Sequence, residues 1–193
     1  MSSEPVALVL TAADPACRAA GAALVPGARL ESLTRERLRP PAPFEGPLFA
    51  LLGAQARGGL VGLVVPGLWV ARVEEGPAAG ALVPVGDHVG LEARGPLSGR
   101  WPAGVPRDFP SMTGIYQPGG VRPHSGARVY SSGVVAAGVA DARRLTRFEA
   151  RAVREGGWPI VSDSLVPAAI VAAYYGMRLA ACAVLQAPRS DRE

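Results

Sequence analysis

Acid–base chemistry is within reach of the segment from Val85 to Tyr116. Asp87 and His88 are adjacent in it, and a carboxylate beside an imidazole can orient the ring and tune its charge near neutral pH. The segment also contains four prolines and shows neither helical periodicity nor strand alternation. Irregular segments often shape a site, which makes His88 a candidate catalytic residue. The interpretation that we favour for His88 is nevertheless a structural histidine whose hydrogen bonds are satisfied.

Two aspartates further along the chain are the next candidates. Asp163 stands between two serines at the end of an expected strand, where its carboxylate could bind sugar hydroxyls or cap the next helix. Asp141 precedes an expected helix. Capping of that helix is favoured over a role in which the carboxyl group contacts a nucleobase. Tyr116 could stack on a base or pack the irregular segment, and the two interpretations carry equal weight.

An alternation of strands and helices must position these residues. Short apolar runs predict buried strands, and Asp14 followed by Pro15 predicts the start of a helix. The strands predicted in the first half of the chain are 5–10, 47–53, 58–65 and 81–91. Residues 29–39 are polar and compatible with a helix, and the arginine-rich residues 34–39 predict a solvated helix face.

The last third of the chain continues this alternation. Strands are predicted over 128–138 and 179–185, and a helix is predicted over 143–157. The helix is expected to place Phe148 on the same side as Val153, and a short strand and a second helix ending at Gly176 follow it. The pattern predicts an α/β fold with a central mixed β-sheet flanked by helices. We expect a single domain over 1–188 and a C-terminal tail over 189–193.

The composition excludes several classes of protein. Of the 193 residues, 49% are hydrophobic and 19% charged, unlike a disordered chain. All 20 basic residues are arginine and they are scattered, so we expect no nucleic-acid partner. The apolar runs are too short to span a bilayer and no signal peptide is apparent, so we expect no membrane partner and a cytoplasmic protein. Cys17 and Cys182 lack the spacing of metal ligands and are most simply buried thiols. We expect neither a metal nor a cofactor.

Several motifs occur in an order and spacing that resemble one enzyme family. They are Asp87-His88; Gly95-Pro96-Leu97-Ser98-Gly99; Phe109-Pro110-Ser111-Met112 with Tyr116; Thr146, Glu149 and Arg151; Val161–Ala168; Ile170–Ala172; and Gly176-Met177-Arg178. Together they resemble the motifs of purine nucleoside phosphorylases of the low-molecular-mass, usually trimeric class, which includes methylthioadenosine phosphorylases. The resemblance covers 80–116 and 145–185 and is weak before residue 80. By this resemblance, the chain would be a shortened and divergent member of that class.

This resemblance implies a nucleoside-phosphorylase-like fold and roles for individual residues. The substrate-binding residues that it implies are Met112, Tyr116, Tyr130, Asp163 and Ser164. It makes Asp141 a displaced acid that would contact the base, with His88 as the second catalytic candidate. Thr11, at the end of the first strand, is the residue that could contact phosphate. Because members of the class are oligomeric, a homo-oligomer, trimer or dimer, is expected.

The chain departs from the family's pattern where phosphate and purine are bound. The first strand opens into Thr11–Ala13 in place of Gly-Ser-Gly, and Asp14 adds negative charge where phosphate would lie. An Arg-x-His-x-Tyr-Glu-Gly loop of the family has no counterpart. The asparagine that reads the base is absent because the chain contains none, and Asp163 stands where the family has a methionine that packs the ribose. We therefore expect weak binding of inorganic phosphate at best.

These residues favour a purine-nucleoside-phosphorylase-like protein in which phosphorolysis is lost or weakened and binding of a nucleoside or purine base is retained. Two alternatives stay open. One is an active nucleoside phosphorylase or hydrolase with a pocket rearranged around Asp141 or Asp163. The other is a non-catalytic, oligomeric interaction protein. A cavity lined by His88, Tyr116, Asp141 and Asp163 would favour ligand chemistry. A cavity filled by Trp69 or Phe44 would favour the interaction protein.

Overall fold

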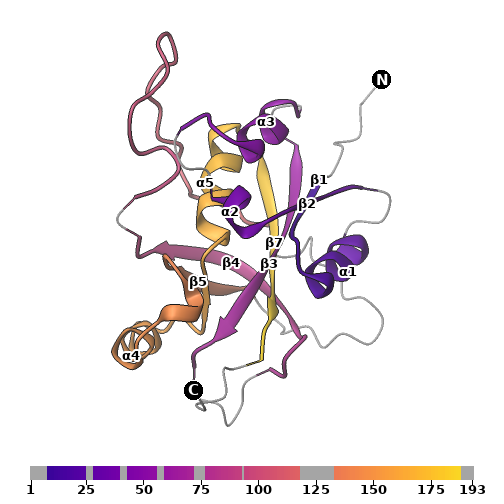
Figure 1. Cartoon of the computed structure of the whole chain (residues 1–193), viewed down its shortest axis with the longest axis vertical. Helices are drawn as coiled ribbons and strands as arrows, with labels where there is room; N and C mark the ends of the chain where they lie inside the picture. The colour runs from indigo at the N-terminus through magenta and orange to yellow at the C-terminus, as the bar shows by residue number, and fades with distance from the viewer. Residues whose placement is uncertain are drawn as a thin grey trace.

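A seven-stranded mixed β-sheet organises the chain (Figure 1). The computed structural model describes residues 8–24, 28–39, 43–55, 59–71, 77–92, 94–117 and 133–187. The strands are β1 (Leu8–Ala12), β2 (Arg29–Leu33), β3 (Leu60–Trp69), β4 (Leu82–Gly90), β5 (Val134–Gly138), β6 (Ile160–Ser162) and β7 (Arg178–Leu185). The helices are α1 (Pro15–Leu24), α2 (Arg35–Leu38), α3 (Pro47–Gly53), α4 (Arg147–Glu155) and α5 (Leu165–Tyr174), with a 3₁₀ turn η3 at Ala142–Arg144.

Five of the strands pair in a closed circuit. β3 pairs with β7, β7 with β4, β4 with β5, β5 with β6, and β6 returns to β3. β1 and β2 extend the sheet from β3 in parallel. The expectation of an α/β fold with a central mixed sheet flanked by helices is confirmed.

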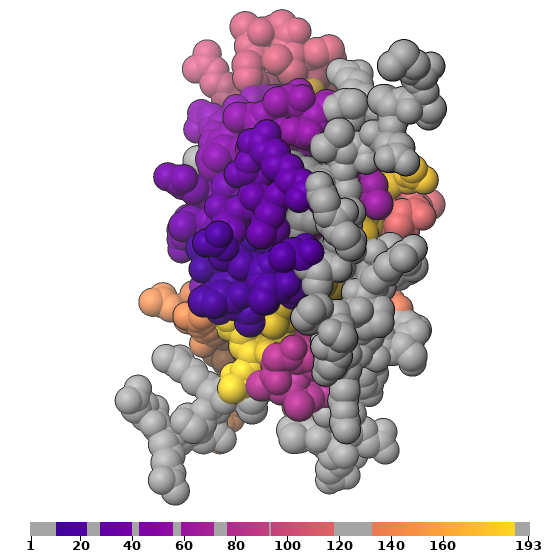
Figure 2. All heavy atoms as spheres, turned by 90° about the vertical axis from the view of Figure 1, so that its right-hand side faces the viewer, coloured from indigo at the N-terminus to yellow at the C-terminus, as the bar shows by residue number. Residues whose placement is uncertain are grey.

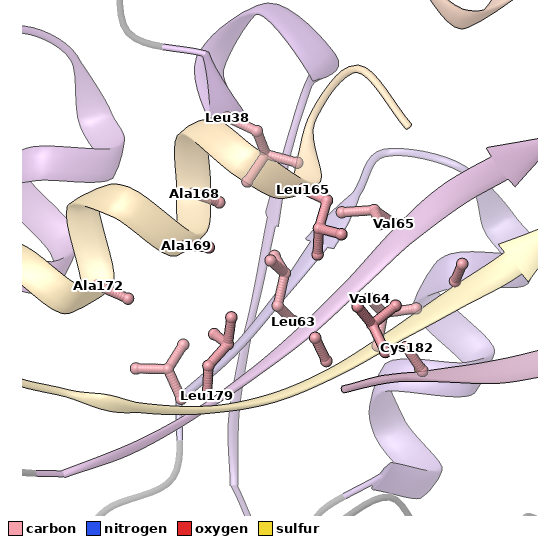
Figure 3. Packing of buried hydrophobic residues seen from close by; sticks show 14 of the residues in the cluster. Leu38, Leu63, Val64, Val65, Leu165, Ala168, Ala169, Ala172, Leu179 and Cys182 are labelled. Atoms are coloured by element: carbon pink, nitrogen blue, oxygen red, sulfur yellow. The ribbon is translucent and has the colours of Figure 1, made fainter. Parts of the chain in front are cut away.

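The longest pair, β3 with β7, is buried on both faces. It runs in parallel from Leu60 opposite Arg178 to Gly67 opposite Leu185. On one face Leu63 lies beneath the small residues of α5, and on the other Cys182 lies toward α1 (Figure 3). A strand covered by helices on both sides needs a continuous apolar run rather than an alternating one. For this reason the sequence predicted both strands, although it did not predict their pairing.

Of the five helices described, four divide into two groups around this pair. α2, α3 and α5 contact one another, and α1 packs against β1 and β3. On the face that Figure 2 shows, the N-terminal segments form most of the described surface, and part of the C-terminal segment is visible below them. In the described part of the chain, no helix combines the length and the apolar character that crossing a membrane requires.

The start of α1 confirms the predicted cap. Asp14 Oδ1 accepts hydrogen bonds from the backbone N–H groups of Ala16 at 2.8 Å and Cys17 at 3.2 Å. Pro15 occupies the first turn, where its missing N–H costs nothing. Burial, together with the nearby Asp14 carboxylate, raises the pKa of the Cys17 thiol to about 12. Cys17 and Cys182 are thus buried, free thiols, as the sequence suggested.

One strand prediction for the first half was wrong. Residues 47–53, expected as a strand, form helix α3, because Pro47 begins a helical turn that buries Leu48 and Leu52 on one face. The polar segment 29–39, expected to be compatible with a helix, forms β2 and then the single turn α2. The helix expected over 34–39 is present as that turn, but Arg35 and Arg39 are partly buried and not fully solvated. The parallel register of β2 with β1 recruits this polar segment to the sheet edge.

The last third follows the prediction closely, with one exception. β6, α5 and β7 occupy the expected places, and Gly176 follows α5 with φ of 67°, a left-handed conformation that glycine tolerates. Helix α4 begins with a capping box between Thr146 and Glu149. The exception is Phe148, whose side chain is 79% exposed although it was expected on the buried side with Val153.

Two glycines let α5 approach the sheet. Gly90 and Gly138 are cross-strand partners in β4 and β5, and both face Val166 of α5. A Cβ at Gly138 would lie 2.4 Å from Val166 Cγ2, whereas a Cβ at Gly90 would lie 3.7 Å from Val166 Cγ1, an ordinary contact. The closeness of α5 therefore depends on the missing side chain at Gly138.

We predict that Gly138→Ala destabilises the protein by about 1–3 kcal/mol, because the added methyl group overpacks the contact with Val166. Urea unfolding monitored by circular dichroism measures this. Gly90→Ala is the matched control, since it adds the same group opposite the same helix, and it should change the free energy of unfolding much less. Equal effects of the two substitutions would contradict the packing argument.

Candidate functional site

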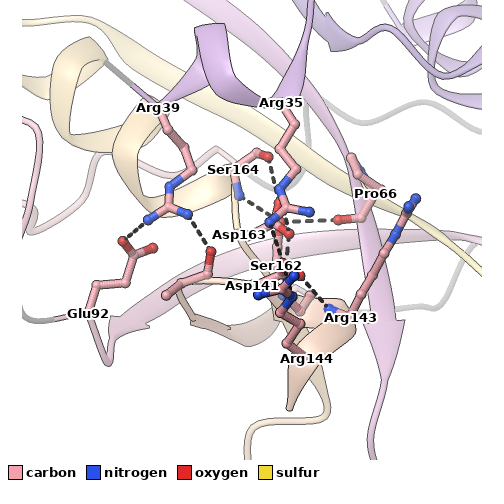
Figure 4. A network of polar contacts seen from close by, with 12 residues as sticks. Arg35, Arg39, Pro66, Glu92, Asp141, Arg143, Arg144, Ser162, Asp163 and Ser164 are labelled. Carbon is pink, nitrogen blue, oxygen red and sulfur yellow. Dashed lines mark hydrogen bonds and ion pairs between the residues drawn. The ribbon is translucent and has the colours of Figure 1, made fainter. Parts of the chain in front are cut away.

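The guanidinium of Arg35 joins three segments that are distant in sequence (Figure 4). Thr34 caps the single turn of α2, accepting from the backbone N–H of Arg37, and so directs Arg35 toward the sheet. Arg35 Nε lies 3.0 Å from Asp163 Oδ2, and its Nη2 lies 3.2 Å from Asp141 Oδ2. Both candidate carboxylates are therefore paired with the same cation.

Asp163 is almost completely buried, at 4% exposure. Its Oδ1 accepts from the Ser164 hydroxyl at 2.8 Å, and its Oδ2 accepts from the backbone N–H of Ala142 at 3.3 Å as well as from Arg35. It does not cap α5, which starts at Ser164 without a side-chain cap. Burial of a carboxylate needs such a set of donors, and here they all come from the protein itself.

Asp141 caps η3 rather than α4. Its Oδ1 accepts from the backbone N–H of Arg143 at 2.9 Å, and Arg144 Nε lies 3.7 Å from Oδ2. Desolvation would raise the pKa of Asp141, but the hydrogen bonds from Arg35 and Arg143 and the charges of Arg35 and Arg144 outweigh it and leave the pKa below its ordinary value. A carboxylate with a lowered pKa is a weaker proton acceptor, which disfavours Asp141 as a general base.

A second arginine of the same segment makes a parallel set of contacts. Arg39 donates to the backbone carbonyl of Ala140 and to Glu92 Oε2 (Figure 4). The side chain of Glu92 is 10% exposed. Its other oxygen, Oε1, is buried and has no hydrogen-bond partner among the described residues. Burial raises the pKa of Glu92, and the charge of Asp163 adds to this, while Arg39 opposes it.

Two clefts lie beside this network. The first, of about 800 Å³, is lined by Arg35, Glu36, Arg39, Glu92, Arg94, Gly95, Pro96, Ser98, Gly99 and Pro167. The second, of about 760 Å³ and more apolar, is lined by Leu91, Val139, Ala140, Asp141, Arg144, Leu145, Glu149, Ala152, Val153 and Trp158. Both volumes lie in the range of sites for small molecules.

Thr11 does not lie in either large cleft. It is fully buried, and its hydroxyl lies 2.9 Å from the hydroxyl of Ser32 in the neighbouring strand. Asp14, three residues later, uses its carboxylate to cap α1. The end of β1 is thus closed by its own contacts.

His88 and Tyr116 form a separate pair. The Nδ1 atom of His88 lies 2.7 Å from the Tyr116 hydroxyl, and Asp87 Oδ1 accepts from the backbone N–H of His88. Desolvation lowers the pKa of His88 more than the Asp87 charge raises it, and burial also raises the pKa of Tyr116. Neither residue lines the two large clefts.

The candidate residues of the sequence therefore fall into groups. Asp141, Asp163 and Ser164 come together around Arg35. Met112 is partly buried against the main core, away from both clefts. Tyr130 lies outside the described residues.

Neither aromatic residue that was considered as a plug fills a large cleft. Phe44 has φ of 65° and packs its ring against Phe49, Trp101 and Tyr174, with ring centroids 5.1–5.2 Å apart. Trp69 packs, partly buried, against the core.

Sequence reasoning missed Arg35, Arg39 and Glu92. The two arginines stand four residues apart after Thr34, a good helix cap, so that they share one face of the turn. This spacing could have indicated that the two arginines act together. Their carboxylate partners lie far along the chain, however, and no local pattern identifies them.

Neither a protein-family model nor a curated protein matches the sequence. Solved structures of purine nucleoside phosphorylases from Schistosoma mansoni are similar to it in fold. One, complexed with a monocyclic inhibitor, is 16% identical, with 66% of this chain and 50% of that chain covered and a TM-score of 0.52. Isoform 2, in complex with cytosine and ribose-1-phosphate, is 17% identical, with 65% and 46% covered and a TM-score of 0.51.

A third structure, in complex with hypoxanthine, is 17% identical, with 69% of this chain and 52% of that chain covered and a TM-score of 0.51. This chain thus spans about half the length of the phosphorylases that it matches. The likeness shows a nucleoside-phosphorylase-like fold, as the sequence motifs implied.

We predict that Arg35→Ala lowers the free energy of unfolding by about 2–4 kcal/mol at neutral pH, because it leaves the buried Asp163 carboxylate without its cation. Chemical denaturation measures the loss. Arg37→Ala on the same turn is the control, because Arg37 is exposed, and its effect should stay within about 0.5 kcal/mol. Similar losses in both variants would contradict the ion-pair assignment.

A second prediction concerns pH. The folded pKa of Glu92 lies above its ordinary value of 4.5, so the folded state binds the proton more tightly than the unfolded state. The stabilisation that protonation of Glu92 contributes is fully present when the pH is below the ordinary pKa of Glu92. It is lost as the pH rises through the raised pKa of the folded state. Relative to Glu92→Gln, the wild-type protein should therefore lose stability as the pH rises above about 4 and through the raised pKa of Glu92. Urea unfolding at each pH tests this, and a difference that stays constant would refute it.

Proposed function

We propose that this protein binds a nucleoside or a purine base and that its phosphorolytic activity is lost or severely weakened. The observation that carries the proposal is the double ion pair of Arg35 with Asp141 and Asp163. The oxygens of Asp163 accept from donors of the protein itself, and Asp141 has a lowered pKa. Neither carboxylate is therefore suited to exchange a proton with a leaving purine.

The end of β1 supports the same proposal. Phosphorolysis needs a cradle of donors for the attacking phosphate. The hydroxyl of Thr11 is buried and shared with Ser32, and the carboxylate of Asp14 stands at the start of α1, where an anion would otherwise be attracted. An incoming phosphate would meet negative charge there.

Binding is supported by the cleft and by the fold. The cleft of about 800 Å³ beside Arg35 offers room for a nucleoside and has polar groups along its wall. Proteins of similar fold were solved in complex with hypoxanthine and with cytosine and ribose-1-phosphate. A nucleobase with or without its sugar is the ligand class that we infer from these two observations together.

One observation favours a second candidate, hydrolysis of a nucleoside. Hydrolysis needs a group that accepts a proton from water as its oxygen bonds to the sugar carbon, while the bond from that carbon to the base breaks and the base takes up a proton. Glu92 lines the cleft, and its buried Oε1 lacks a hydrogen-bond partner among the described residues. The pKa of this carboxyl group is raised. It is the group that we would assign to this step.

Thermal melting against purine and pyrimidine nucleosides, free bases and phosphate tests the proposal. A ligand at a hundredfold over its dissociation constant adds about 2.7 kcal/mol, a shift of about 5–10 °C for a chain of this size. We expect a shift with a nucleoside or base, none with phosphate alone, and no release of base when phosphate and nucleoside are combined.

Base release measured by chromatography separates the alternatives. Release that depends on phosphate would overturn the proposal, and release without phosphate that disappears in Glu92→Gln would establish the hydrolase instead. Absence of any shift would leave an interaction protein. Glu155→Gln serves as the control for the substitution, because Glu155 is an exposed residue of α4, outside both clefts.

A further inference from the structure

The larger cleft carries a guanidinium that has no ion-pair partner among the described residues. Three arginines line it, and two of them, Arg35 and Arg39, are engaged in ion pairs with carboxylates. The third, Arg94, is exposed and makes no ion pair with any residue that the structure describes. A guanidinium free at the wall of a cleft is suited to a phosphate or carboxylate group of a ligand.

The same wall carries an acceptor that the fold leaves unsatisfied. Glu92 is nine-tenths buried, and its Oε1 has no hydrogen-bond partner among the described residues, although Oε2 is paired with Arg39. An unsatisfied buried acceptor is costly. Oε1 has almost no accessible surface in this structure, so a ligand N–H or O–H reaches it only when the Glu92 side chain turns toward the cleft that it lines. The Arg39 charge offsets that of Glu92, so the carboxylate does not exclude an anionic ligand.

A hydroxyl group stands close to Arg94 in sequence and in the cleft wall. Ser98 closes a tight turn in which its backbone N–H donates to the Gly95 carbonyl at 3.0 Å and its hydroxyl oxygen accepts from the Gly95 N–H at 3.1 Å. Because that oxygen is used as an acceptor, the hydroxyl proton stays available for a ligand oxygen. Ser98 and Arg94 thus place two donors on one short loop.

We propose that this cleft binds a nucleoside monophosphate, with Arg94 and Ser98 contacting the phosphate and the Glu92 side chain, turned toward the cleft, accepting a hydrogen bond from an amine or hydroxyl of the nucleoside. The volume of about 800 Å³ exceeds what a free base or inorganic phosphate fills. The nucleoside part of this ligand rests on the proposed function. The phosphate part rests on Arg94 and Ser98 alone.

Isothermal titration calorimetry at low salt tests the inference with AMP, GMP, adenosine, guanosine and inorganic phosphate as the probes. We expect a monophosphate to bind about tenfold or more tightly than its nucleoside, the range of one charge-assisted hydrogen-bond pair. Arg94→Ala should abolish this difference and leave nucleoside affinity unchanged. Glu92→Gln should weaken nucleoside and nucleotide alike by about tenfold or more, because the amide can place a donor where the acceptor was.

Controls keep the outcomes distinct. Arg178→Ala removes an exposed arginine at the start of β7, outside both clefts, and should change no affinity. Melting curves confirm that Arg94→Ala, a substitution of an exposed residue, is folded. Nucleosides that bind as tightly as monophosphates would overturn the inference and leave the proposed function intact. Phosphate that binds as tightly as AMP would also overturn it, and no binding by any nucleoside or nucleotide would overturn both proposals.

Discussion

The contact of one guanidinium with two carboxylates supports the polar end of this fold. α2 is a single turn, and a helix of that length has no stability of its own. Arg35 ties it to the junctions that follow β5 and β6, and Arg39 ties it to the segment after β4. The larger cleft exists because these four segments are brought together, so its shape depends on charge pairs and not only on apolar packing.

The same contacts are the basis of the proposal that phosphorolysis is lost or weakened in this fold. Catalytic carboxylates are useful when their proton affinity is matched to the reaction and their oxygens face the substrate. Here the oxygens of Asp163 face protein donors, and Asp141 is a weakened base. Both carboxylates thus contribute to contacts within the protein, and in this arrangement they do not act on a ligand. Glu92 is the opposite case, because its buried Oε1 has no hydrogen-bond partner among the residues that the structure describes.

The sequence predicted what depends on local pattern. Continuous apolar runs identified β3 and β7, and Asp14 with Pro15 identified the start of α1. It failed at 47–53, because a run of seven apolar residues fits a buried strand and a short helix equally well. It also failed for Arg35 and Glu92, whose partners lie over fifty residues away and are brought near only by the closed circuit of strands.

The close approach of α5 to the sheet also limits how this sequence can change. Gly138 leaves no room for a side chain opposite Val166, and Asp163 and Ser164 lie immediately before that contact. A larger residue at 138 is tolerable only with a smaller one at 166, so these two positions should covary among related sequences. Covariation of positions 138 and 166 should therefore identify relatives of this chain better than the acidic or hydroxyl residues of the cleft do. Each of those cleft residues can be exchanged without a compensating change elsewhere.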